Sequence, residues 1–172
     1  MRTSFTGKPI KSCANSHGFP AFIKTISTRC CMVDKERLLS KLDELDGYLE
    51  ELRKILPTNF KVYQTIPIKR GTERLLQLCI ECVIDICQLL VSGLRLGLPT
   101  DELDLFEKLL KHKILSPKTT SLLRKMKGFR NILAHDYGEV DDELVFETSS
   151  KRLGDFRVFK NEVLKYLRKN SP

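Results

Sequence analysis

The feature that most limits how this chain can fold is a long apolar stretch over residues 72–96. Leu, Ile and Val occupy nearly every side of a helix drawn through it, from Leu75 to Val91. A membrane span needs about 20 residues with few charges, and Glu81 and Asp85 stand in the middle of this stretch. We therefore expect a central helix buried by other helices, and no membrane span.

One row of polar side chains interrupts the central helix. Its members recur every three or four residues and therefore share a face: Arg74, Gln77, Glu81, Asp85, Gln88, Ser92 and Arg95. The row is either the solvent-facing edge of a core helix or the lining of a cleft or dimer interface. In the second case the carboxylates of Glu81 and Asp85, one turn apart, would orient cations.

The rest of the chain continues the helical pattern. Leucines recur every three or four residues from Leu38 to Leu56, and Pro57 ends this first helix. Residues 58–71 are expected to form a connection or an irregular start to the central helix, with Pro67 and Gly71 as breaks. After the central helix stops at Gly97 and Pro99, further helices are expected from Thr100 as N-cap to about Lys113, from Ser116-Pro117 to Gly138, from Asp141-Asp142, and through Leu153 to Leu167. Without any alternating strand pattern, the sequence predicts an all-α bundle of four to six helices.

Residues 1–31 differ in composition from the rest. They hold five basic residues and no acid, so they carry +5 of the net charge of +8. They also lack the unbroken apolar run of roughly 7–15 residues that a secretory signal needs. A transit peptide, a functional disordered tail and translation from Met32 remain as alternatives. We expect residues 32–172 to form a single domain, preceded by this basic extension.

The cysteines favour a reducing compartment. Cys79 and Cys82 form a CxxC, but no second pair or histidine lies at the spacing of a zinc site. Together with Cys87 they are expected to be reduced thiols packed in the central helix. We therefore expect no metal site and a cytoplasmic location.

The residues best suited to binding or catalysis lie between 128 and 137. Eight Lys and Arg and no acid occur from Lys108 to His135, and acids follow at once. A basic surface leading to Arg130, His135 and Tyr137 suits the binding of a phosphodiester. A solvated basic face without function is the alternative. The basic residues are Lys108, Lys111, Lys113, Lys118, Arg124, Lys125, Lys127 and Arg130.

Arg130 and His135 together suit RNA cleavage. An Arg side chain presents a fixed fork of donors to phosphate oxygens, and a His side chain gives or takes a proton near neutral pH. RNA supplies its own nucleophile, the 2′-hydroxyl, so the reaction needs no metal. On a straight helix, side chains five residues apart differ by about 140°. Either the helix loosens near Ala134, or Arg130 and His135 meet across two subunits of a symmetric dimer.

The Arg130-x4-His135-x-Tyr137 pattern resembles the Arg-x4–6-His signature of the HEPN superfamily. More closely, the run Arg-Asn-Ile-Leu-Ala-His-Asp-Tyr is similar to that of HepT-like ribonuclease toxins, and the similarity covers about residues 32–170. The resemblance implies an α-helical homodimer that cleaves RNA without metal or cofactor in a cleft between subunits. It also implies a HepT/MntA-type, or type VII-like, toxin–antitoxin pair.

The resemblance also implies roles for individual residues. Arg130 would hold the scissile phosphate, His135 would act as acid and base, and cleavage would leave a 2′,3′-cyclic phosphate. A small nucleotidyltransferase antitoxin would add AMP to Tyr137 and so block the site. Asn131 would help to fix the local geometry, with Glu81 and Asp85 as further supporting residues. The acid-free basic stretch, independently of the resemblance, predicts an RNA-binding patch of Lys118, Arg124, Lys125 and Lys127.

Two other functions stay open at this point. The chain could be a non-catalytic helical partner, or nucleotide-binding subunit, of a small nucleotidyltransferase. It could also be a structural helical protein whose motif only packs. The sequence does not distinguish transfer, messenger and ribosomal RNA as targets, because their backbones are chemically alike.

Overall fold

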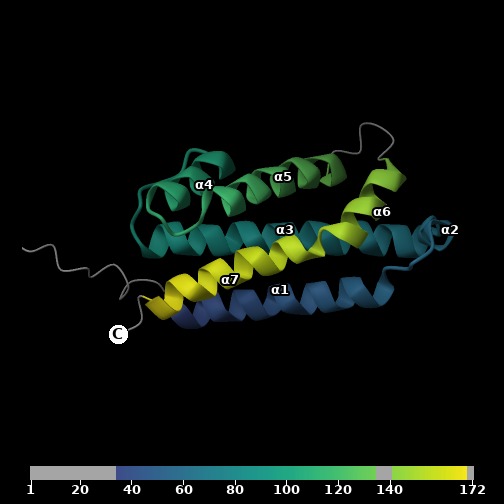
Figure 1. Cartoon of the computed structure of the whole chain (residues 1–172), viewed down its shortest axis with the longest axis horizontal. Helices are drawn as coiled ribbons and strands as arrows, with labels where there is room; N and C mark the ends of the chain where they lie inside the picture. The colour runs from purple at the N-terminus through teal and green to yellow at the C-terminus, as the bar shows by residue number, and fades with distance from the viewer. Residues whose placement is uncertain (1–33, 135–140, 170–172) are drawn as a thin grey trace, which may run out of the picture.

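The computed structural model describes residues 34–134 and 141–169, and every regular element within these ranges is a helix. In Figure 1, α3 runs through the middle, α4 and α5 lie on one side of it, α1 and α7 on the other, and α2 and α6 at one end. This confirms the predicted all-α class. The helices are α1 (Lys35–Ile55), α2 (Phe60–Tyr63), α3 (Ile66–Gly93), α4 (Glu102–Lys111), α5 (Pro117–Ala134), α6 (Asp142–Lys151) and α7 (Leu153–Lys169).

The predicted helix boundaries are correct in part. Helix α1 carries the expected leucine stripe, with every leucine from Leu38 to Leu52 in that stripe buried. The expected breaks at Pro67 and Gly71 are wrong, because α3 already begins at Ile66 and passes through both residues. Pro67 lies in the first turn, where a backbone N–H has no partner within the helix and its loss costs little.

The helix caps explain where α4, α5 and α6 begin. The N-cap of α4 is Asp101 and not Thr100, since the Asp101 carboxylate accepts a hydrogen bond from Asp104 N at 2.8 Å. The expected start of α5 is confirmed: Ser116 Oγ accepts from Thr119 N at 3.2 Å. Asp141 caps α6 as expected, accepting from the backbone N–H of Glu143 at 3.0 Å.

Helix α3 is the core helix that the sequence predicted. Its length and composition would allow it to cross a membrane, yet 56% of its most apolar 18-residue segment is buried inside the bundle. Its contacts are with α1, α4 and α5 above all. The apolar face of α3 is therefore covered by neighbouring helices of the same chain.

The three cysteines of α3 are buried free thiols, as expected. Cys82 Sγ donates to the Lys41 carbonyl oxygen of α1 at 3.1 Å. Burial raises the pKa of Cys82 to about 11 and the pKa of Cys79 to about 12, since a low dielectric disfavours the thiolate. These groups are consequently packing groups between α1 and α3, protonated at neutral pH.

A second, smaller core joins the start of α3 to α6. The Tyr63 ring is fully buried and packs against Phe60 and Phe146, with centroid distances of 6.0 and 5.3 Å, while Phe60 and Phe146 lie 5.4 Å from each other. Beside this aromatic group, Lys69 of α3 forms an ion pair with Asp142 of α6 at 2.5 Å. The first turns of α3 and α6 are thus attached to each other.

Candidate functional site

The part of the predicted motif that the structure describes lies in the last turns of α5. The Arg130 side chain is partly exposed there, and Asn131 is exposed. His135 and Tyr137 lie outside the described residues, as do Gly138 and the extension of residues 1–31. The predicted roles of His135 and Tyr137 therefore remain predictions.

Arg130 is paired with an acid that the sequence reasoning missed. Its Nη1 lies 3.4 Å from Oε1 of Glu102, the first residue of α4. Lys127 Nζ lies 3.9 Å from the other carboxylate oxygen of Glu102, which is buried and makes no hydrogen bond with the described residues. Glu102 is an acid in the first turn of a helix, a common position that gave no sign of this pairing.

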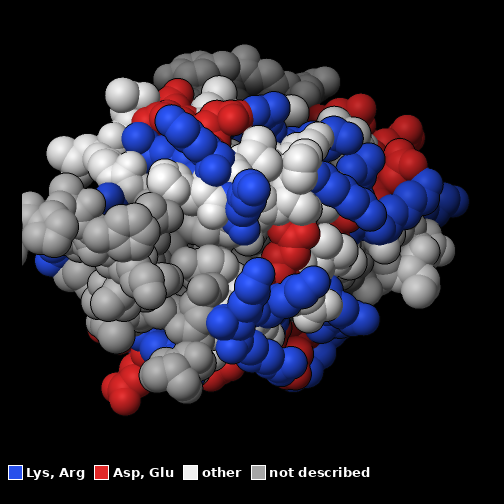
Figure 2. Space-filling view, turned by 60° about the vertical axis from the view of Figure 1, so that its left-hand side comes forward, with Lys and Arg blue, Asp and Glu red and all other residues white. Residues whose placement is uncertain are grey.

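The predicted RNA-binding patch is divided between two sides of α5. Arg124 forms an ion pair with Glu107 of α4, and Lys127 with Glu102, so both face α4. Lys125 lines a groove on the other side, and Lys118 shares that side because it lies two turns earlier. Figure 2 shows Lys and Arg side chains in groups on one face, with Asp and Glu beside them. A stretch without acids in the sequence is thus partly neutralised by α4 in space.

The carboxylates of the α3 polar row contact α1 and α3 itself. Glu81 accepts a hydrogen bond from Gln77 Nε2 at 2.9 Å. Asp85 forms an ion pair with Lys41 of α1 at 3.2 Å, and its side chain is 47% exposed. The hydrogen bond to Glu44, assisted by Asp85, raises the pKa of Lys41. Within one chain, the partners of Glu81 and Asp85 lie on α3 and α1, whereas the partner of Arg130 lies on α4. The supporting role of Glu81 and Asp85 stays a prediction.

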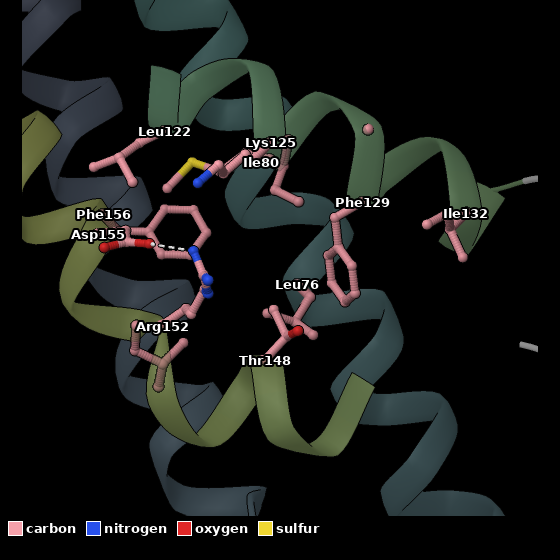
Figure 3. A pocket seen from close by; sticks show the side chains of 13 residues that line it. Leu76, Ile80, Leu122, Lys125, Phe129, Ile132, Thr148, Arg152, Asp155 and Phe156 are labelled. Carbon is pink, nitrogen blue, oxygen red and sulfur yellow. Dashed lines mark ion pairs between the residues drawn. The ribbon is translucent and has the colours of Figure 1, made fainter. Parts of the chain in front are cut away.

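The face of α5 turned away from α4 borders an apolar groove of about 400 Å³ between α5 and the α6–α7 corner. Figure 3 shows Phe129 and Ile132 of α5 on one side of it and Thr148 and Arg152 on the other. Arg152 is linked to Asp155 at 3.8 Å at the end where Lys125 lies. Gly128 also borders the groove, and a Cβ added there would meet no atom within 4 Å. Arg130 does not line this groove.

No group of three His, Cys, Asp or Glu side chains within residues 34–134 and 141–169 is arranged to hold a metal ion. The described part of the site contains cations on α5 and the acids of α4 that pair with them. Such cations can bind the oxygens of a phosphodiester.

The chain is similar to known nucleases in sequence. The family model described as Ribonuclease HepT-like matches residues 45–163. The tRNA nuclease HepT of Aphanizomenon flos-aquae is 30% identical over 129 residues, which are 74% of this chain and 88% of the relative. The mRNA nuclease HepT of Shewanella oneidensis is 25% identical over 122 residues, or 71% of this chain and 92% of the relative.

Solved structures share the fold. One is the tri-AMPylated HEPN toxin of Shewanella oneidensis in complex with the MNT antitoxin, with a TM-score of 0.69 and 24% identity over 74% of this chain and 96% of that one. Another is YutE of Bacillus subtilis, a cytosolic protein of unknown function, with a TM-score of 0.69 and 20% identity over 82% of this chain and 96% of that one. The helical arrangement is thus shared with both.

Proposed function

The chain belongs to the HepT-like ribonuclease family, and from this premise we propose that it cleaves RNA as the toxin of a toxin–antitoxin pair. The observation that carries the proposal is the Arg130-x4-His135-x-Tyr137 motif inside the matched region, with Arg130 on the partly exposed end of α5. Relatives are named as nucleases of tRNA and of mRNA, so the proposal covers both RNA classes.

In the proposed reaction, Arg130 holds the scissile phosphate through its guanidinium, which matches phosphate oxygens in geometry and charge. His135 takes the proton of the adjacent 2′-hydroxyl as the 2′-oxygen forms a bond to phosphorus. The bond from phosphorus to the 5′-oxygen breaks, and that oxygen receives the proton that His135 took up, so His135 acts as base and then as acid. The products are a 2′,3′-cyclic phosphate and a free 5′-hydroxyl. The RNA supplies the nucleophile, so these groups suffice without a metal ion.

The proposed antitoxin is a small nucleotidyltransferase of the MNT type. A related toxin is described as tri-AMPylated in its complex with such a partner. We assign the acceptor role to Tyr137: its hydroxyl would attack the α-phosphate of ATP, and pyrophosphate would leave. The added AMP would be a bulky anion next to His135 in the chain and would compete with RNA phosphate for Arg130. Two copies of the chain in the cytoplasm, with paired motifs, complete the proposal.

The test is cleavage of total tRNA and of a messenger transcript by purified protein in the presence of EDTA. Arg130→Ala and His135→Ala should each lower the rate by about 10²-fold or more. Arg157→Ala, at an exposed arginine of α7, serves as the matched control and should cleave normally. RNA cleavage that persists in both motif variants would refute the proposal. Absence of cleavage together with stable nucleotidyltransferase binding would favour the non-catalytic partner.

A further inference from the structure

The contact between Arg130 and Glu102 has a consequence for the proposed reaction. We infer that Glu102 is a positioning residue: its carboxylate holds one nitrogen of the Arg130 guanidinium and so orients the remaining N–H donors toward an RNA phosphate, while Lys127 stays as the counter-ion of Glu102. The inference rests on the proposed function, because it gives Arg130 the role of phosphate clamp. Glu102 itself does not touch the reacting atoms in this scheme.

The contact uses only part of the Arg130 guanidinium, because Glu102 lies next to Nη1 and an Arg side chain has five N–H donors. The Arg130–Glu102 distance of 3.4 Å is longer than the roughly 2.7–2.9 Å of a strong charge-assisted hydrogen bond. The second oxygen of Glu102 has Lys127 at 3.9 Å and no hydrogen bond among the described residues. A buried carboxylate oxygen without a hydrogen bond is costly, so this pair is held less firmly than a bidentate pair. The other N–H donors of the guanidinium can therefore bind a phosphate while Nη1 stays next to Glu102.

The backbone beneath Glu102 is well fixed. Glu102 is the first helical residue of α4, directly after the N-cap Asp101. Asp104 closes the turn from both sides: its N–H donates to Asp101 at 2.8 Å and its carboxylate accepts from Thr100 N at 3.0 Å. Two hydrogen bonds thus hold the turn that presents the Glu102 carboxylate to Arg130. A group that positions a clamp has to be supported in this way.

A second ion pair between the same two helices provides a comparison. Glu107 of α4 pairs with Arg124 of α5, but these side chains are 46% and 51% exposed, against 24% and 28% for Glu102 and Arg130. Solvent screens the outer pair more strongly, so it restrains its arginine less. The Glu107 pair has the same residue types and the same helices, which makes Glu107→Gln the matched control for Glu102→Gln.

Removal of the Glu102 charge should strengthen RNA binding and at the same time slow RNA cleavage. In Glu102→Gln a negative charge beside the bound phosphate is lost, so RNA should bind about 3- to 10-fold more tightly. The guanidinium also loses its fixed position, so the cleavage rate at saturating RNA should fall about 10-fold. Glu107→Gln should tighten binding by a smaller factor without lowering the saturated rate. A residue that only stabilised the fold would weaken binding and rate together.

The experiment measures the two quantities separately. Binding of a fluorescein-labelled, mixed-sequence single-stranded RNA is followed by anisotropy in a His135→Ala background, where the probe is not consumed. Single-turnover cleavage is followed with His135 intact, at saturating total tRNA or messenger transcript. Glu102→Asp keeps the charge and should recover part of the rate. Thermal unfolding of each variant shows whether the fold is retained.

The inference is overturned if Glu102→Gln binds RNA no more tightly than the wild type, if it keeps the wild-type saturated rate, or if Glu107→Gln slows cleavage equally. The binding comparison needs no cleavage and so stands on its own. If the proposed function itself were wrong, the result would be different: Arg130→Ala would cleave RNA as fast as the wild type, or no variant would cleave RNA at all. The two failures are therefore distinguishable.

Discussion

Helix α5 meets α4 with one face and the α6–α7 corner with the other, and the two faces are built from different groups. On the α4 face, Arg124, Lys127 and Arg130 each have an acid of α4 as partner. On the opposite face, apolar side chains such as Phe129 line an open groove. Phe129 and Arg130 are neighbours in the sequence, yet one contributes packing and the other charge.

This difference separates stability from chemistry along a single helix. Partly exposed ion pairs contribute little to folding, because water screens them and long side chains lose freedom. Apolar contacts contribute in proportion to the area they remove from water. We therefore expect substitutions on the groove face to change the free energy of unfolding, and substitutions on the α4 face to change RNA binding and cleavage.

The largest expected effect on stability is that of Phe129→Ala. Phe129 packs against both apolar cores while remaining partly exposed, so its truncation should lower the free energy of unfolding by about 2–4 kcal/mol. Urea denaturation measures this change. Ile132→Ala, at a groove residue that is 47% exposed, should cost less than about 1 kcal/mol. Equal losses for both variants would contradict the assignment of Phe129 to the cores.

A smaller effect of opposite sign is expected at Gly128. Glycine within a helix costs about 0.5–1 kcal/mol relative to alanine, and a Cβ at Gly128 would meet no atom within 4 Å. Gly128→Ala should therefore raise the free energy of unfolding by about that amount. Gly47→Ala on α1 is the matched control, since its Cβ also enters open space. If Gly128→Ala lowered the free energy of unfolding while Gly47→Ala did not, the groove would be narrower than described.

The smallest expected effect on stability is that of Glu107→Gln, which breaks the exposed pair with Arg124. Its free energy of unfolding should change by less than about 0.5 kcal/mol, because both side chains are about half exposed. Denaturation in low salt and in 1 M salt measures any electrostatic contribution. A loss above about 1 kcal/mol would mean that the α4 face contributes to folding as the groove face does, and the comparison would fail.

Much of the fold follows from local patterns in the sequence. The leucine stripe of α1, the apolar α3 and the caps at Ser116 and Asp141 depend on helical spacing and on single side chains near the backbone. The start of α3 could not be placed in the same way. A proline ends a helix in most positions but is tolerated in the first turn. The packing of the α3 start against α2 and α6 decides that Pro67 lies in a first turn.

The candidate site was predictable only in the residues of the motif. Arg130 stands out because its neighbours in sequence are basic and because His135 follows. Glu102 does not stand out, since its pairing with Arg130 requires α4 and α5 to pack side by side. For the same reason the acid-free stretch overstated the positive charge: the neutralising acids precede it in the chain and meet it only in space.

The early start of α3 also bears on the residues that carry the proposed chemistry. It places Lys69 where it pairs with Asp142, the first residue of α6, while α5 packs against α3 further along. The two helices on either side of residues 135–140, α5 and α6, are therefore both in contact with α3. The additional turns at the start of α3 therefore fix where α6 begins relative to α5.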